Sequence, residues 1–283
     1  RMTDAMGRQL VKFADQWATI EDTPTPDDIA TLGLLLDLLG RTNQDVLLVD
    51  RTLDRFSSAN LHVTVDDAFV ESLLNRSVLQ DSPVRDCILG TRIVGSARLS
   101  GNVTATLLPS VGSVRIRVAL DGTVSSNNTG YNGPVRLRTS GNGVVHATRD
   151  IQVDETGVNM ETVLASGSLT TRINAIEHPL RLVRRIARKR AGQQKWKADR
   201  IAHERFISRI SEAFTEETDR ASIDPNADVL KEARAYLRRL NFSEPTRTIG
   251  STSDAVYAFA TVRNANQLAA PIPPPEIEII NEA

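Results

Sequence analysis

The residues that most often carry out catalysis or bind metals are few and far apart in this sequence. The single cysteine is Cys87, and the histidines are His62, His146, His178 and His203. None of these residues has a second histidine or cysteine at the spacing of a metal site, and His203-Glu204 lacks the partner histidine of a zinc protease helix. We therefore expect no metal site, no cofactor and no catalytic residue set.

Glycine-rich stretches predict turns between strands, not phosphate-binding loops. GNGVVH, which begins at Gly141, has His146 where a dinucleotide-binding loop needs its third glycine, and it joins two predicted strands. Asp121-Gly122 and Asn132-Gly133 likewise predict turns. The sequence has no serine nucleophile elbow and no lysine-bearing phosphate loop. An enzyme would need a site assembled from scattered residues.

One stretch has a strong charge pattern in a chain whose formal net charge is −1. RLVRRIARKRAGQQKWKADR, residues 181–200, contains nine basic residues and one acidic residue. At 100° per residue, six of the basic residues fall within roughly 120° of a helix surface, opposite Val183, Ile186, Ala187 and Ile201. We call these six residues the basic arc: Arg181, Arg184, Arg185, Arg188, Lys189 and Lys195.

The basic arc has three interpretations. Ordinary charge balance favours a solvated helix face, offset by the acidic regions before Phe56 and after Ser211. Binding to anionic lipid head groups or another anionic envelope polymer comes next, because clustered cations beside an apolar stripe and Trp196 suit an interface. Nucleic-acid binding is least favoured, because the chain has no overall basic excess and no recognisable nucleic-acid motif.

Residues 1–58 predict an N-terminal helical layer. The first helix is indicated by apolar residues at helical spacing, and the second by Thr25 as cap and Pro26 at the first helical position. A third helix is expected over residues 46–56. The apolar residues of the first helix are Met6, Leu10, Phe13, Trp17 and Ile20.

Residues 59–176 predict an antiparallel β-sheet domain with one short helix. LHVTV, from Leu61, alternates like a strand, and Asp66 can cap a helix that ends near Asn75. From about residue 84, seven short strands are expected, and Cys87 is expected to be buried there. We also expect the apolar stripe of the short helix to be buried: Phe69, Leu73 and Leu74.

The remainder predicts a helical hairpin over residues 177–242 and a C-terminal strand with a proline-rich tail over 243–283. The first hairpin helix should run from about His178 to Thr218, and it either breaks near Gly192 or changes partners there. Asp224-Pro225 should open the second helix. AVYAFATV predicts a strand, and the tail PIPPPEIEII is expected to dock on its own domain or on a protein partner.

Together these segments predict an α+β fold: an antiparallel β meander forming a curved sheet, packed with a long amphipathic helix and an N-terminal helical layer. The stretch HVTVDDAFVESLLN and the meander over residues 84–176 resemble the tubular lipid-binding (TULIP-like) proteins and related bacterial envelope proteins. The resemblance covers under half of the chain. It implies a curved sheet that wraps a helix around an apolar, lipid-binding groove.

The leading hypothesis is a non-enzymatic bacterial cell-envelope protein that binds a lipid-like ligand or scaffolds a partner through its curved sheet. The alternatives are an enzyme with a dispersed site and a protein that binds anionic polymer or nucleic acid through residues 181–200. The preference for arginine over lysine is typical of a GC-rich bacterial genome. Because the sequence begins with Arg1, we expect an upstream segment that could hold a signal or anchor, and the leading hypothesis predicts an envelope or periplasmic location.

Overall fold

The computed structural model describes residues 4–9, 11–12, 25–43, 46–221, 231–240, 242, 244–264 and 267–270. The chain divides into two compact units. Unit 1 comprises Arg1–Thr64, Ala227–Ile249 and Tyr257–Ala283, and unit 2 comprises Val65–Asn226 and Gly250–Val256.

The helices of unit 1 begin where capping chemistry predicts. Helix α2 (Pro26–Arg41) has a capping box between Thr25 and Asp28, and α3 (Val46–Phe56) follows it. The core that they share consists of Leu32, Leu36, Leu39, Val49 and Leu53. Both predicted helices are confirmed. Residues 4–9 and 11–12 are helical, and the rest of the first predicted helix lies outside the described residues.

A small sheet has the strand order β1-β10-β9. Its strands are β1 (Leu61–Asp66), β9 (Thr246–Ser251) and β10 (Ala255–Thr261). The strands predicted from LHVTV and AVYAFATV are confirmed, whereas β9 was not predicted. Helix α6 spans Lys231–Arg239. The Asp224-Pro225 helix start and the proline-rich tail lie outside the described residues.

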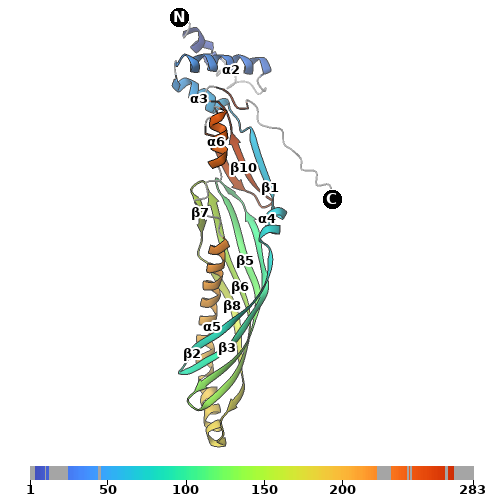
Figure 1. Cartoon of the computed structure of the whole chain (residues 1–283), viewed down its shortest axis with the longest axis vertical. Coiled ribbons are helices and arrows are strands. Elements are labelled where there is room, and N and C mark those ends of the chain that lie inside the picture. The colour runs from blue at the N-terminus through green and yellow to red at the C-terminus, as the bar shows by residue number, and fades with distance from the viewer. Residues whose placement is uncertain are drawn as a thin grey trace, which may run out of the picture. The chain divides into compact units, whose positions relative to one another are not determined.

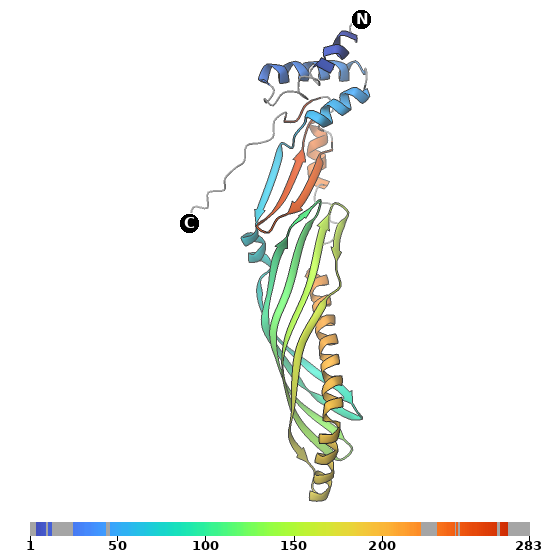
Figure 2. The same ribbon diagram turned by 180° about the vertical axis from the view of Figure 1, so that it is seen from behind.

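Unit 2 contains an antiparallel meander along which the 41-residue helix α5 (Arg181–Ala221) runs, as the two views in Figures 1 and 2 show. Its long strands pair in chain order. The short strand β4 (Ser110–Val111) pairs with the end of β9, and the short strand β7 (Gly157–Met160) pairs with β6. The predicted α+β fold is confirmed. The long strands are β2 (Arg76–Ile88), β3 (Thr91–Leu108), β5 (Val114–Asn132), β6 (Val135–Asp154) and β8 (Leu164–Glu177).

Several glycines that predicted turns instead lie inside these long strands. This is so for Gly101-Asn102, Asp121-Gly122, the Gly141–Gly143 stretch and Ser166-Gly167, so the expected seven short strands were wrong. A Cβ on Gly101 would lie 2.3 Å from the Asp121 carbonyl oxygen, and one on Gly167 would lie 2.3 Å from that of Val144. Glycine therefore permits a close strand approach that any side chain would prevent.

Three other predicted turns are confirmed because their glycines have positive φ angles. Gly133 follows Asn132 with φ 56°, Gly112 ends Pro109–Gly112 with φ 80°, and Gly157 ends Glu155–Gly157 with φ 140°. A side chain at these positions would strain the backbone, whereas glycine adopts the conformation freely. Backbone conformation at a turn and strand contact within a sheet thus both favour glycine, and local sequence does not distinguish them.

Helix α4 (Asp67–Leu74) forms where predicted, but its apolar stripe is not buried. Phe69 is 57% exposed and Leu73 is 68% exposed, and Leu74 is half-buried. The helix is held at its ends instead, because the Asp66 side chain accepts from the Ala68 amide and the Asn75 side chain accepts from the Ala105 amide of β3. The predicted burial of these three residues was wrong.

Cys87 is exposed, contrary to the sequence prediction. It lies near the end of β2, which is an edge strand of the sheet. Side chains alternate between the two faces of a strand, and here Ile88 is buried while Cys87 faces outward.

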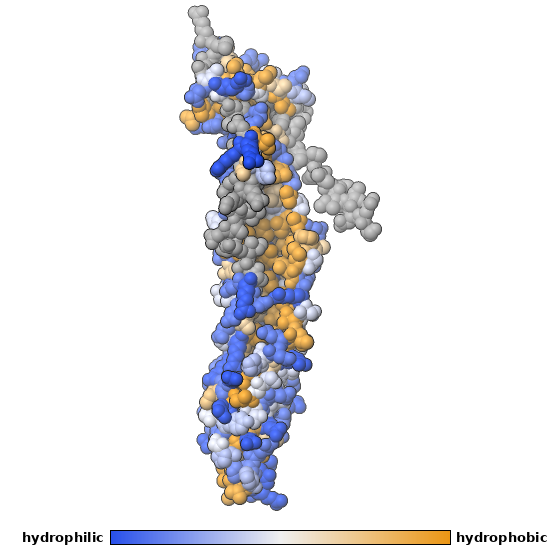
Figure 3. Space-filling model, viewed as in Figure 1, coloured by the Kyte–Doolittle hydropathy of each residue, from blue (hydrophilic) through white to orange (hydrophobic). Residues whose placement is uncertain are grey.

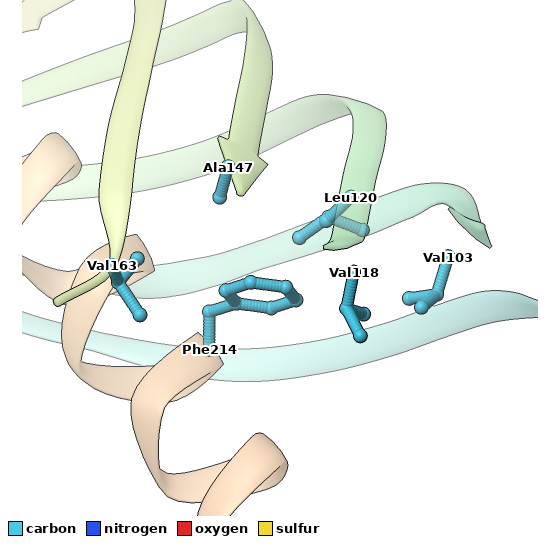
Figure 4. Packing of buried hydrophobic residues seen from close by; sticks show 6 residues of the cluster. All are labelled: Val103, Val118, Leu120, Ala147, Val163 and Phe214. Carbon is cyan, nitrogen blue, oxygen red and sulfur yellow. The ribbon is translucent and has the colours of Figure 1, made fainter. Parts of the chain in front are cut away.

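Helix α5 is continuous through Gly192, so the change in its apolar face reflects a change of partners and not a break. Its C-terminal part carries Phe214 into a core with residues from β3, β5, β6 and the segment before β8, as Figure 4 shows. The buried members of this cluster are Val103, Val118, Leu120, Ala147, Val163 and Phe214.

Phe214→Ala should lower the free energy of unfolding of unit 2 by about 3–5 kcal/mol, because the ring fills this core and its loss leaves a cavity. The control is Leu73→Ala, which removes an exposed side chain and should change stability by about 0.5 kcal/mol or less. Urea unfolding followed by circular dichroism measures both. Equal losses in the two variants would contradict the observed burial.

Candidate functional site

A long cavity of about 520 Å³ lies between the inner face of the unit 2 sheet and helix α5, and we call it the groove. All five long strands contribute to its walls. On α5 the lining runs from Val183 to Ala213, a length of about 45 Å at 1.5 Å per residue. The aliphatic and aromatic residues of the lining include Ile93, Leu99, Val124, Leu137, Leu169, Val183, Ile186, Phe206 and Ile210.

The groove is hollow because the residues that face it are small. Helix α5 turns a series of alanines toward the sheet, at spacings that keep them on one side of the helix. Facing positions in the middle of the sheet are also small, among them Ala97 and Gly141. Larger side chains at these positions would fill the cavity. The alanines are Ala187, Ala191, Ala198, Ala202 and Ala213.

Hydrogen bonds attach α5 to β8 along one side of the groove. Lys195 Nζ donates to the Thr171 carbonyl oxygen at 3.0 Å, and the Thr171 hydroxyl donates to the Asp199 carboxylate. One turn further, His203 Nε2 lies 3.0 Å from the carbonyl oxygen of Gly167. These contacts fix the helix beside β8 without filling the space over the inner strands.

An ionic clamp attaches α5 to β2 on the other side. Arg205 and Arg209 both donate to the carboxylate of Asp86, whose side chain is only 9% exposed. Arg205 also donates to the carbonyl oxygen of Cys87 at 3.1 Å. Because β2 and β8 are the edges of the meander, these two sets of contacts make α5 the wall that completes the groove.

The Phe214 core and a polar network close one end of the groove. The Arg149 guanidinium, whose side chain is 9% exposed, donates to the Thr218 hydroxyl and to the Asp219 carboxylate. Next to it in β6, Asp150 accepts from Arg117 at 2.7 and 2.8 Å. These hydrogen bonds lower the pKa of Asp150, against the smaller opposing effect of burial. Arg149 thus anchors the C-terminal part of α5 to the sheet, whereas the Asp150–Arg117 pair joins β5 to β6 on the opposite face.

All six residues of the basic arc lie on α5, but Lys195 has different surroundings from the other five. Lys195 lines the groove and pairs with Asp199. The other five precede the clamp, and none of them forms an ion pair with a carboxylate that the structure describes. The neighbouring Leu182 is 68% exposed, and Leu180 and Ile186 are exposed as well. In Figure 3 the end of unit 2 where α5 begins shows hydrophobic and strongly hydrophilic residues side by side.

Trp196, which the sequence placed beside the basic arc, is also exposed. Two cationic groups lie over its ring, that of Lys197 at 5.3 Å and that of Arg200 at 5.8 Å from the centroid. This part of α5 therefore offers cations and large apolar side chains on one surface.

Within the described part of the chain, no helix is both long and apolar enough to cross a membrane.

The structure also aligns three residues that resemble a hydrolase constellation. Asp121, His146 and Ser166 face one another across β5, β6 and β8, and His146 Nδ1 lies 2.7 Å from Asp121 Oδ1. All three are exposed on the outer face. Among the described residues, no hydrogen bond joins His146 to Ser166. Asp121 therefore orients the imidazole of His146, but the imidazole does not activate the serine hydroxyl. No cluster of three metal-ligating residues occurs among the described residues.

Asp86→Asn should weaken the clamp, because it removes the charge that two guanidinium groups share in a shielded position. We expect stability to fall by about 1–3 kcal/mol and amide exchange in residues 203–213 to quicken. The control is Asp81→Asn in the same strand, which breaks the exposed pair with Arg98 and should leave amide exchange in α5 unchanged. Hydrogen exchange mass spectrometry measures the effect, and unaltered protection of α5 in Asp86→Asn would contradict the clamp.

Comparison with known proteins adds little to this geometry. A scan of protein families found no match, and a search of curated proteins found none either. Among solved structures, the chain is similar to a lipopolysaccharide binding protein at 12% identity and a TM-score of 0.26, over 78% of this chain and 54% of that one. The chain therefore spans about half the length of that protein. So low a TM-score carries no argument, and the resemblance to tubular lipid-binding proteins stays a prediction.

Proposed function

We propose that unit 2 binds the acyl chain of a lipid in the groove and that the basic arc brings the protein to an anionic membrane surface. The observation that carries this proposal is the groove itself, a cavity between a curved sheet and α5 whose lining residues span about 45 Å of that helix. The hydrocarbon core of a bilayer, which is two acyl chains deep, is only about 30 Å thick. The groove is therefore long enough for an extended chain.

The chemistry of the walls supports an apolar and flexible ligand. Aliphatic side chains from the sheet face a row of alanines on α5, and such surfaces gain free energy when a hydrocarbon chain displaces water from them. A compact polar metabolite would leave most of this wall uncovered. A lipid binder of this kind fits the bacterial cell envelope, and we propose that location.

The surface of α5 supports the membrane part of the proposal. Arg181, Arg184, Arg185, Arg188 and Lys189 lack ion-pair partners among the described residues, and the exposed side chains of Leu180 and Leu182 lie beside them. Cations attract anionic head groups, and the apolar side chains can enter the boundary between head groups and acyl chains.

A hydrolase remains the second candidate, and only the row of Asp121, His146 and Ser166 favours it. Native mass spectrometry of the purified chain separates the two candidates. A copurifying acyl lipid supports the first, and a bound polar metabolite supports the second.

Ala198→Trp should block the groove, since it places an indole where α5 now presents a methyl group to the cavity. Displacing two or three buried methylenes costs about 2 kcal/mol, or about 30-fold in affinity for octadecanoate. Gln193→Trp adds the same ring at an exposed position of α5 outside the groove and should leave the affinity unchanged. Competition against a fluorescent fatty acid measures both. Equal affinities in Ala198→Trp and wild type would overturn the groove as the binding site.

Replacing Arg184, Arg185, Arg188 and Lys189 by glutamine should abolish cosedimentation with anionic liposomes, because each cation near the surface contributes about 1 kcal/mol. Raising the salt concentration should weaken wild-type binding in the same way.

The control removes the same number of positive charges from exposed, ion-paired positions: Arg76, Arg98, Arg138 and Arg220. It should retain binding, and neutral liposomes should bind none of the proteins strongly. Undiminished sedimentation of the first variant would remove the basic arc from the proposal.

A further inference from the structure

The inner face of the sheet is not uniformly apolar. Two adjacent cross-strand rows, Ser82–Ala97–Ser126–Gly141–Thr171 and Val84–Gly95–Asn128–Thr139–Ile173, contain most of its hydroxyl and amide groups. Aliphatic residues flank them along the strands, with Ile93 and Leu137 on one side and Leu99 and Val124 on the other. We call the polar members of the two rows the polar band: Ser82, Ser126, Asn128, Thr139 and Thr171.

Part of the polar band is satisfied by protein partners. Thr171 donates to Asp199, and Asp199 also accepts from Lys195, so the polar contacts beside β8 are complete. The hydroxyl of Thr139 contacts the Asn128 carbonyl oxygen at 3.5 Å. Ser82 on the edge strand is exposed to solvent, whereas Ser126 and Asn128 at the centre of the band have hydrogen-bonding capacity that the protein does not satisfy.

Asn128 uses only one end of its side-chain amide. Its Nδ2 donates to Ser126 Oγ at 3.2 Å, whereas Oδ1 is enclosed and has no hydrogen-bond donor among the described residues. Ser126 accepts that bond, which leaves its own hydroxyl proton available. An enclosed acceptor without a donor is destabilising, and buried side-chain amides usually have both ends paired.

Two glycines make room for these polar atoms beside the facing strands. A Cβ on Gly95 would lie 2.3 Å from Asn128 Oδ1, and a Cβ on Gly141 would lie 2.8 Å from Ser126 Oγ. Neither polar atom therefore has a side chain above it on the facing strand. The terminal torsion of asparagine is broad, so a rotation can turn Oδ1 from Gly95 toward a ligand, and this rotation exchanges the 3.2 Å hydrogen bond from Nδ2 to Ser126 Oγ for the bond to the ligand.

We infer that the groove selects an amphiphile with a hydroxyl or secondary amide within its apolar part, which donates to Asn128 and accepts from Ser126. A group that both donates and accepts satisfies both open positions, whereas an unsubstituted chain leaves an unpaired acceptor against hydrocarbon. The inference rests on the proposed function and narrows its ligand to hydroxylated or amide-linked acyl chains.

The test is displacement of a fluorescent fatty acid by octadecanoate, by a series of hydroxyoctadecanoates that differ in hydroxyl position, and by the matching oxo-octadecanoates. At least one hydroxyl isomer should bind about 3- to 10-fold more tightly than octadecanoate, the range of one net hydrogen bond. Its oxo counterpart, which cannot donate, should lose that advantage.

Asn128→Leu should abolish the preference while octadecanoate still binds. The matched control is Asn127→Leu, which changes the same residue type at the next, exposed position on the outer face and should keep the preference. Thermal unfolding should show both variants folded, because Asn128→Leu removes an unpaired acceptor.

Each outcome is decisive. Binding of all ligands with equal affinity, or a hydroxyl preference that persists in Asn128→Leu, would overturn this inference and leave the proposed function standing. No binding of any acyl chain, including octadecanoate, would overturn both.

Discussion

Neighbouring strands of unit 2 approach so closely at Gly95, Gly101, Gly143 and Gly167 that a side chain there would collide with the facing strand. Closely packed, strongly coiled strands of this kind need residues without a Cβ. The coiling lets the sheet curve until its edge strands, β2 and β8, both reach α5. The groove, its length and its closed end all depend on this curvature.

Helix α5 has two roles, and different parts of its sequence carry them. Its C-terminal half carries Phe214 and the partners of Arg149, which fix it to the sheet. Its N-terminal half turns alanines toward the sheet and carries the five cations of the basic arc that have no ion-pair partner among the described residues. A helix so anchored can leave a cavity beneath the part that precedes Phe214, because the lost packing there is offset by the core and by the ionic clamp at Asp86.

The fold class could be predicted from sequence because it depends on local patterns. Alternation identified the meander, helical spacing identified α5, and the Thr25 and Asp66 caps began helices where predicted. Strand lengths could not be predicted, because Gly101 and Gly133 look alike in sequence while one permits strand contact and the other a positive φ.

The site was predicted only in outline. Basic residues at helical spacing placed the basic arc on one helix, and Lys195 and Asp199 have the local spacing of a helical ion pair, but nothing local shows that this pair faces Thr171 of β8. The ionic clamp and the polar band join residues far apart in the chain, so sequence order gives no signal for them. The alternation of polar and aliphatic rows on the inner face becomes visible only once the register is known.

The proposed ligand is an acyl chain that lies between the inner face of the sheet and α5. Photocrosslinking with a fatty acid that carries a diazirine near its methyl end, followed by peptide mapping, tests this most directly. Crosslinks should fall on groove-lining residues of β3, β5 and α5, among them Leu99, Val124 and Phe206. Crosslinks confined to the outer face of the sheet, or to unit 1, would contradict it.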